Sequence, residues 1–238
     1  MKIALVRVGV DSACGGIQGP LFRDGTFEFI PIPDDKHGVD RRTYGNTIGR
    51  HGRGLVEYFP PRVRSRMAGI PMHVDPEFET FTYGDPTPPK KSLRQLEAGD
   101  LLIFYAGLEG WNFECAPALY IIGYFKVEFG GVGSSFLRTV LHKHFGRNFH
   151  VMHDDVFASE RDKVILIKGS ARSRLLTKAA KLGERQRLPS GSWWQLISPA
   201  MAEIFGRFGG IGSLQRSTPR WVEPQFIESA ANFVRSLT

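Results

Sequence analysis

Two apolar stretches in the middle of the chain constrain its fold more than any other feature. Residues 101–105 and 118–127 are rich in Leu, Ile, Phe and Tyr; the first follows Gly99 and the second follows Pro117. Short apolar runs between such breakers are typical of buried strands. The connection between them is aromatic, so the two stretches are predicted to form a long-looped antiparallel pair.

Shorter patterns extend this sheet and add helices around it. Further strands are predicted at residues 2–10, 26–30 and 164–167, and helices at 134–144, 173–180, 200–205 and 225–237. The expected fold is α+β, with a mixed, mainly antiparallel central sheet and flanking helices. A chain of 238 residues, 42% of them hydrophobic, can bury one full core, so residues 1–238 are predicted to form a single domain. Residues 34–71, polar and rich in arginine, are predicted to be a long basic loop region within it.

No segment predicts a membrane span or secretion. The apolar runs are shorter than the roughly 18 to 20 residues that a membrane helix needs. Residues 1–7 carry a lysine and a short apolar run without a cleavage site, which favours a first strand over a signal peptide. Cys14 and Cys115 match no metal or redox spacing. We expect reduced thiols and a cytoplasmic location.

Positive charge is concentrated in two stretches. The formal net charge is +7, and the arginines of residues 41–66 are opposed only by Glu57, while residues 161–187 form a second basic stretch. Guanidinium groups pair bidentately with phosphate oxygens, so the expected partner is a nucleic acid, DNA more than RNA, or a nucleotide. A solvated face that keeps the protein soluble is the alternative. The expected phosphate-binding residues are Arg41, Arg42, Arg50, Arg53, Arg172 and Lys178.

The first strand runs into a glycine-containing loop that is suited to a nucleotide. Glycines allow backbone N–H groups to approach a phosphate or base closely, and an aspartate can accept hydrogen bonds from base or ribose. The loop matches neither a Walker motif nor GxGxxG spacing. A turn in which the aspartate caps its own loop explains the same residues. The candidates are Arg7, Asp11, Ser12, Gly15 and Gly16.

A histidine with nearby carboxylates stands in the irregular stretch that follows. His73 and Asp75 precede Pro76, and Tyr83 and Asp85 come shortly after. Loops on a rigid scaffold often carry catalytic groups, and a histidine beside carboxylates can transfer protons. Fastening of the loop to the core is the alternative. The expected catalytic residues are His73, Asp75, Asp85 and Asp11, with Tyr83 at the nucleotide.

A second histidine group does not predict a metal site. Its members are His142, His144, His150 and His153, with Asp154 and Asp155. His142 and His144 are two residues apart on a predicted helix and point to different sides. Without cysteines or an i, i+4 pair, the pattern lacks metal-ligand spacing. No metal is expected, and no cofactor is indicated.

The aromatic residues of the central strand pair suggest a place for a base. Tyr105 ends the first strand and Trp111 lies in the connection. Aromatic rings stack on bases with little sequence preference, so these two are the expected stacking residues. Packing in the core is the alternative.

Residues 99–127 resemble the corresponding hairpin of PUA-like β-barrels, including the EVE and ASCH groups, which accommodate modified or flipped bases. This resemblance implies some barrel character in the sheet and a pocket for a base. It covers about 30 residues of the chain.

A broader resemblance covers most of the chain. It is carried by Arg7-Val8-Gly9-Val10-Asp11-Ser12, His73-Val74-Asp75-Pro76, Tyr83-Gly84-Asp85, Gly99-Asp100-Leu101 and Lys168-Gly169-Ser170. This ordered series resembles the nucleotide modification associated domain type 3 family, which is described in terms of DNA base hypermodification. Val8 and Val10 depart from the lysine and phenylalanine usual near the first glycine of the family. The resemblance implies a context for the protein rather than a particular reaction.

The resulting hypothesis is a protein that binds a nucleotide or an extruded base of DNA and assists or carries out base hypermodification. Base flipping would bring the target out of the stack, and the arginines would hold the phosphate backbone. One alternative is a non-catalytic reader of modified DNA or RNA. A further alternative is a metal-dependent nuclease of a defence system, in which Asp75 and Asp85 would bind the ion.

Overall fold

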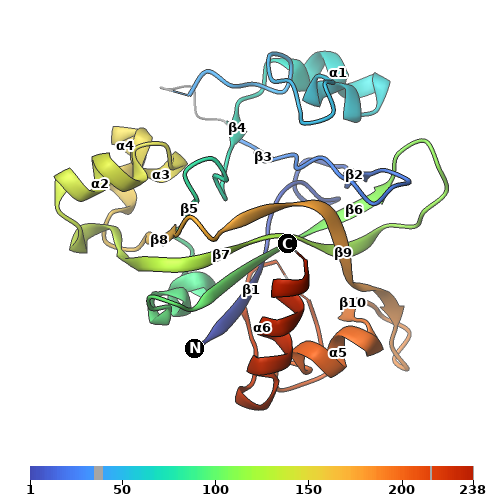
Figure 1. Cartoon of the computed structure of the whole chain (residues 1–238). Coiled ribbons are helices and arrows are strands. Elements are labelled where there is room, and N and C mark those ends of the chain that lie inside the picture. Colours follow the sequence, from blue (N-terminus) through green and yellow to red (C-terminus); the bar gives the residue numbers. More distant parts are fainter. Residues whose placement is uncertain (35–39, 215, 238) are drawn as a thin grey trace.

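A large mixed sheet runs through the molecule (Figure 1), in a computed structural model that describes residues 1–34, 40–214 and 216–237. The strand order along its main path is β10-β9-β7-β6-β1-β11. β1 pairs in parallel with β6, as does the short β2, and the other pairings are antiparallel. The strands are β1 (Ile3–Arg7), β2 (Gly19–Leu21), β6 (Leu101–Gly110), β7 (Ala118–Val132), β9 (Arg174–Arg187), β10 (Trp193–Ile197) and β11 (Arg220–Trp221).

The predicted central pair of strands is confirmed. β6 and β7 are antiparallel neighbours, with Leu102 opposite Phe125 and Phe104 opposite Gly123. Nearly every residue of the paired segments 101–108 and 118–127 is buried, and these segments are continuously apolar rather than alternating, as is typical of strands covered on both faces. The rings of Phe104 and Phe125 pack edge to face with centroids 4.6 Å apart, and Phe78 packs against both.

A second branch of the sheet carries part of the cavity described below. β8 (Ile165–Gly169) pairs with the distal half of β7 and with β5 (Thr82–Asp85). A separate two-stranded sheet joins β3 (Ile32–Pro33) to β4 (Met72–His73). The 3-10 helix η2 (Pro88–Gln95) follows β5 and leads back into β6.

The helices lie in three groups around the sheet (Figure 1). α1 (Pro61–Ala68) follows the 3-10 helix η1 (Leu55–Tyr58) above it, and α2 (Arg138–Phe145), α3 (Phe149–Met152) and α4 (Asp154–Glu160) gather beside β8. α5 (Pro199–Phe205) and α6 (Ile227–Ser236) lie below it and agree with the predicted helices; the 3-10 helix η4 (Pro224–Phe226) directly precedes α6. Helix α2 begins later than predicted, after the 3-10 helix η3 (Gly133–Ser135).

Two of the predicted elements are wrong. The basic segment 173–180 is not a helix but the start of β9, where Leu175 lies opposite Gly123 and Ala180 opposite Ile121 of β7. The alanines, lysines and leucines of this segment favour a helix locally, but pairing with a buried central strand outweighs that preference. Residues 26–30 form isolated bridges at Thr26 and Phe27 rather than a strand. Residues 34–71 contain η1 and α1, and residues 35–39 of this predicted loop lie outside the described residues.

The mixed α+β fold with a mainly antiparallel sheet is confirmed, but the described strands do not close into a barrel. β10 and β11 end the strand path at opposite edges, so the barrel character implied by residues 99–127 is not confirmed. Among the described residues, no helix combines the length and the apolar character needed to span a bilayer.

Candidate functional site

Separate segments of the chain converge on one cavity of about 690 Å³, which we call the polar cavity. The end of β1, the β3–β4 sheet, β5, η2 and the α3–α4 pair all contribute to it. Five residues singled out from the sequence line it, together with a sixth from the segment before β11: Arg7, His73, Asp75, Tyr83, Asp85 and Arg216.

Two arginines share one buried carboxylate at one side of the polar cavity. Nη2 of Arg7 lies 3.2 Å from Oδ2 of Asp11, and Arg216 donates to the same oxygen from Nε at 3.0 Å and Nη2 at 2.9 Å. Burial disfavours the charge on Asp11, but Arg216 and Arg7 outweigh it and lower the pKa of this carboxyl. Nε of Arg7 is buried and has no hydrogen-bond partner among the residues that the structure describes. Two guanidinium groups against one carboxylate leave an excess of positive charge here, which suits an anionic ligand.

The loop after β1 is capped by its own aspartate. Oδ1 of Asp11 accepts hydrogen bonds from the backbone N–H groups of Ala13 and Cys14. Gly15 has a φ of 101°, and a Cβ there would lie 2.6 Å from Val10, so the turn requires glycine. Cys14 lines the polar cavity, whereas Ser12, Gly15 and Gly16 do not. The turn alternative weighed for this loop therefore accounts for its shape.

A lysine, an aspartate and a tyrosine form a second polar group. Nζ of Lys90 lies 2.9 Å from Oδ2 of Asp85, and the hydroxyl of Tyr83 donates to the same oxygen at 3.1 Å. Burial opposes the charge on Asp85, but Lys90 and the hydrogen bonds of Thr87 outweigh it and lower the pKa of Asp85. Asp85 is thus an ionised acceptor at the edge of the polar cavity, paired with Lys90.

The third group consists of two histidines and the buried carboxylate of Asp75. Pairing of β3 with β4 sets Ile32 opposite His73, which brings Asp34 to 3.1 Å from Nδ1 of that histidine. Nδ1 of His150 lies 2.7 Å from Oε2 of Glu160. Burial lowers the pKa of His73 and raises that of Asp75 well above its usual range.

Asp75 is held by two donors that also place His150. Its Oδ2 accepts from the backbone N–H of Gly84 at 2.7 Å and from Nδ2 of Asn148 at 3.3 Å. Oδ1 of Asn148 in turn caps α3 by accepting from the N–H of His150. A Cβ at Gly84 would lie 2.7 Å from the His150 ring and 2.9 Å from Asn148. Only glycine therefore fits at this point of β5.

The segment 72–78 separates the polar cavity from a second, smaller hollow of about 260 Å³. His73 and Asp75 line the polar cavity, whereas Val74 and Pro76 line the smaller hollow together with Arg42 and Arg50. The arginine-rich segment and the catalytic candidates thus lie on opposite sides of one strand-like segment.

The expected stacking residues do not line the polar cavity. Tyr105 is 0% exposed within the main core, and burial raises its pKa to about 12. Trp111 packs edge-on against Tyr58 with ring centroids 5.0 Å apart. Its Nε1 is buried, and no described residue offers it a hydrogen bond. Tyr105 thus packs in the core, whereas Trp111 is partly buried beside a second hydrophobic cluster. The ring pair at the polar cavity is instead His73 stacked on Phe149 at 3.9 Å.

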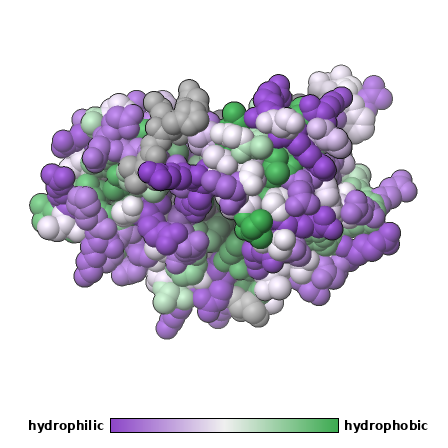
Figure 2. Space-filling model, turned by 90° about the horizontal axis from the view of Figure 1, so that it is seen from above, coloured by the Kyte–Doolittle hydropathy of each residue, from purple (hydrophilic) through white to green (hydrophobic). Residues whose placement is uncertain are grey.

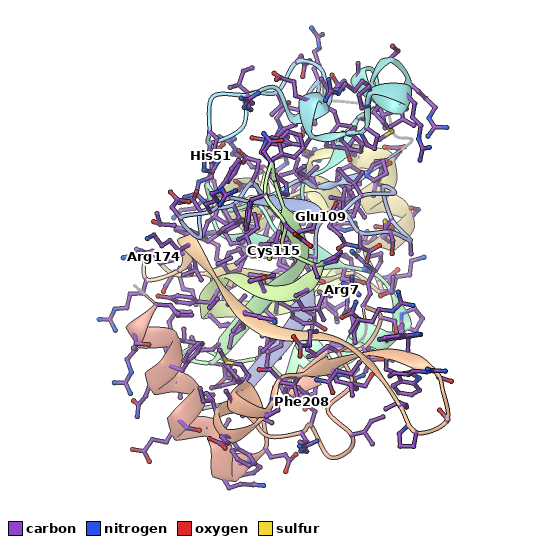
Figure 3. All side chains as sticks on the ribbon, turned by 90° about the vertical axis from the view of Figure 1, so that its right-hand side faces the viewer. Arg7, His51, Glu109, Cys115, Arg174 and Phe208 are labelled. Carbon is purple, nitrogen blue, oxygen red and sulfur yellow. The ribbon has the colours of Figure 1, made fainter. Side chains whose placement is uncertain are left out.

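The basic stretches meet away from the polar cavity. Nη1 of Arg50 donates to the carbonyl of Leu176 in β9 at 2.8 Å, which joins the arginine-rich segment to the second basic stretch. Figure 3 shows His51 and Arg174 near the left-hand edge of the molecule, whereas Arg7 is labelled further to the right, away from that edge. Seen from above, hydrophilic side chains cover most of the face that carries α1 (Figure 2). Arg42 pairs with Asp40, Arg53 with Glu57, and the side chains of Arg41, Arg172 and Lys178 are exposed.

Sequence patterns missed Asp34, Lys90, Asn148, Glu160 and Arg216 because each stands alone in its own segment. His150 was grouped with His142, His144 and His153, but the structure separates them. Nδ1 of His153 donates to the backbone carbonyl of Phe149 at 3.0 Å. His142 and His144 line a different hollow beside Lys168. Only the capping position of Asn148 before α3 carried a local signal.

A family model described as nucleotide modification associated domain 3 matches residues 2–233, nearly the whole chain, and the chain belongs to this family. The match covers every residue of the three polar groups above. No curated protein and no solved structure matches the chain.

Proposed function

We propose that this member of the nucleotide modification associated domain 3 family binds a nucleotide, or a base extruded from DNA, in its polar cavity and takes part in modifying it. The observation that carries the proposal is the convergence of an arginine pair, an ionised Asp85 and a stacked ring pair on one cavity of about 690 Å³. A site of this size is ordinary for a small ligand. A nucleotide offers a matching set of groups: an anion, a flat ring and polar edges.

In the proposed arrangement the phosphate lies between Arg7 and Arg216. The two guanidinium groups already share Asp11, and Nη2 of Arg216 also donates to the carbonyl of Gly9. In this proposal, N–H groups that these contacts do not use donate to phosphate oxygens. The buried Nε of Arg7, which has no partner among the described residues, adds to this demand for an acceptor.

The base lies toward His73 and Phe149, whose stacked rings supply an aromatic edge. Asp85, kept ionised by Lys90, accepts hydrogen bonds from an exocyclic amino group or a ribose hydroxyl. Modification of the base then takes place beside His73 and Asp75. Asp11 acts indirectly, because it is engaged with both arginines and orients them.

DNA would reach the polar cavity with its backbone on the exposed basic side chains. Arg41, Arg53, Arg172 and Lys178 are exposed, and Arg50 ties their two segments together. Such contacts position a duplex without reading its sequence. A flipped nucleotide is needed because the cavity is built for a single base.

Calorimetric titration with deoxynucleoside monophosphates and with the corresponding nucleosides tests the proposal. The monophosphates should bind more tightly than the nucleosides, and Arg216→Ala should weaken them about tenfold or more while leaving nucleosides nearly unchanged, since it removes charge-assisted hydrogen bonds. Arg187→Ala, at an exposed position on β9, is the matched control. Equal affinity of the wild type and Arg216→Ala for monophosphates would remove the proposed phosphate position.

Mass spectrometry of nucleosides separates an enzyme from a reader of modified DNA. DNA from cells that express the wild-type chain is compared with DNA from cells that express Asp85→Asn. A nucleoside of new mass that disappears with Asp85→Asn supports modification. Unaltered DNA together with tight binding of a modified nucleotide identifies a reader.

A further inference from the structure

We propose that His73, Asp75 and His150 bind one divalent first-row transition-metal ion in the polar cavity. One potential ligand atom from each residue lies within 4.8 Å of the others. Nε2 of His150 and Oδ2 of Asp75 are 3.7 Å apart. Ligands at about 2.1 Å from one ion stand at most about 4.2 Å apart, so small side-chain rotations close the site.

The two histidines are already oriented as metal ligands. Nδ1 of His73 faces Asp34, and Nδ1 of His150 faces Glu160, so each ring has Nε2 left for an ion. A carboxylate on the far nitrogen fixes the tautomer and the ring direction and makes the ligating nitrogen more basic.

The buried carboxylate supplies the second, independent observation. Oδ2 of Asp75 accepts from Gly84 and Asn148, whereas Oδ1 is buried without a hydrogen-bond partner in the described part of the chain. A buried carboxylate oxygen without a partner is costly, and such an atom in a folded protein commonly marks an ion or a water. A divalent cation between Asp75 and the histidines would satisfy it.

The electrostatic setting is consistent with this assignment. The carboxylates of Asp34 and Glu160 stand behind the two rings, so the ion would meet negative charge beyond its direct ligands. No cysteine lies in the set, which selects against soft Cu(I) and favours Zn²⁺, Fe²⁺, Mn²⁺ or Co²⁺.

Three protein ligands leave coordination positions open toward the cavity. Two histidines and one carboxylate are the ligand set of sites in which a water or a substrate atom completes the coordination. An ion here would lie beside the proposed nucleotide. His73 would then be a metal ligand rather than the residue that transfers a proton. The metal proposal is independent of nucleotide binding, because its test uses the ion alone.

The test is a titration of tag-free, chelator-dialysed protein with Co²⁺, followed by visible absorption, and with Zn²⁺, followed by calorimetry. The wild type should bind one ion per chain, with nitrogen and oxygen ligation in the Co²⁺ spectrum. Asp75→Asn and His150→Gln should each weaken binding at least about a hundredfold. Glu160→Gln, which keeps the shape of the side chain behind His150 but removes its charge, should weaken it about ten- to a hundredfold.

The matched control is His142→Gln, an exposed histidine on α2 outside the set, which should bind as the wild type does. Circular dichroism of each variant shows whether it is folded, and Glu160→Gln keeps the test valid if a buried substitution unfolds the chain. The proposal is overturned if the wild type binds no ion stoichiometrically, or if folded Glu160→Gln and Asp75→Asn retain wild-type affinity.

Discussion

The polar cavity and the arginine-rich segment 41–66 both contain many charged residues, but these residues are arranged differently in the two regions. In the segment, charge is dense along the sequence, yet Arg42 and Arg53 are each paired within two to four residues and several others are exposed. In the polar cavity, charges come singly from distant segments and are buried together. Density along the chain is therefore a poorer guide to a site than burial of groups that meet across the fold.

The largest difference is expected from breaking one ion pair in each region. Arg7→Met leaves Asp11 with only Arg216 in a buried setting, and should lower the free energy of unfolding by about 3 kcal/mol. Arg53→Met breaks an exposed pair with Glu57 and should cost about 0.5 kcal/mol or less. Urea denaturation of both variants measures the difference. Equal losses would contradict the view that only the cavity charges are structurally coupled.

Glycine-to-alanine substitutions compare how tightly the polar cavity and the arginine-rich segment are packed. Gly84→Ala places a Cβ 2.7 Å from His150, 2.9 Å from Asn148 and 3.2 Å from Asp75, and should destabilise the protein by about 2 kcal/mol. Gly69→Ala, at the end of α1, meets nothing within 4 Å and should change stability by about 0.5 kcal/mol at most. Thermal unfolding reports both values. A neutral Gly84→Ala would show that β5 can move away from α3.

Acid should weaken the arginine pair's hold on Asp11. The pKa of Asp11 in the folded protein is lowered from 3.8, so its ionic contribution is present above that value and is lost as pH falls through the folded pKa. The wild type should therefore be more stable than Asp11→Asn at pH 7, by about 1 to 2 kcal/mol, and the gap should shrink at acid pH. Urea midpoints at several pH values measure it. If the difference in stability between the wild type and Asp11→Asn stays constant down to strongly acidic pH, the charge of Asp11 does not contribute to folding stability.

The smallest effect is expected on DNA affinity from single exposed arginines. If Arg41 contacts a backbone phosphate, Arg41→Ala should lower the salt slope of duplex binding by about 0.9 and weaken binding equally for all sequences. Arg216→Ala should lower the slope by a similar amount if a nucleotide of the duplex is extruded, because the proposed phosphate position lies beside its side chain in the cavity. Fluorescence anisotropy over a range of salt concentrations measures both. Identical slopes for the wild type and Arg41→Ala would remove this arginine from the backbone contacts.

Much of the scaffold could be predicted because its signals are local. The apolar runs of β6 and β7 and the patterns of α5 and α6 stand within single segments. β9 was missed for the opposite reason: its residues favour a helix, and only its neighbours in the sheet, β7 and β10, make it a strand. Local preference is weak compared with the burial of paired strands.

By itself, the sequence determined the strand pair at the centre and drew attention to Arg7, His73, Asp75, Tyr83 and Asp85, because each stands in a recognisable motif. Only the tertiary structure decided that these residues share one cavity and that Arg216, Lys90, His150 and Glu160 complete it. It also decided that Tyr105 is buried in the core and that Trp111 packs against Tyr58. The physical reason is distance along the chain: Arg216 reaches Asp11 across 205 residues, and no local pattern records a contact that folding alone creates.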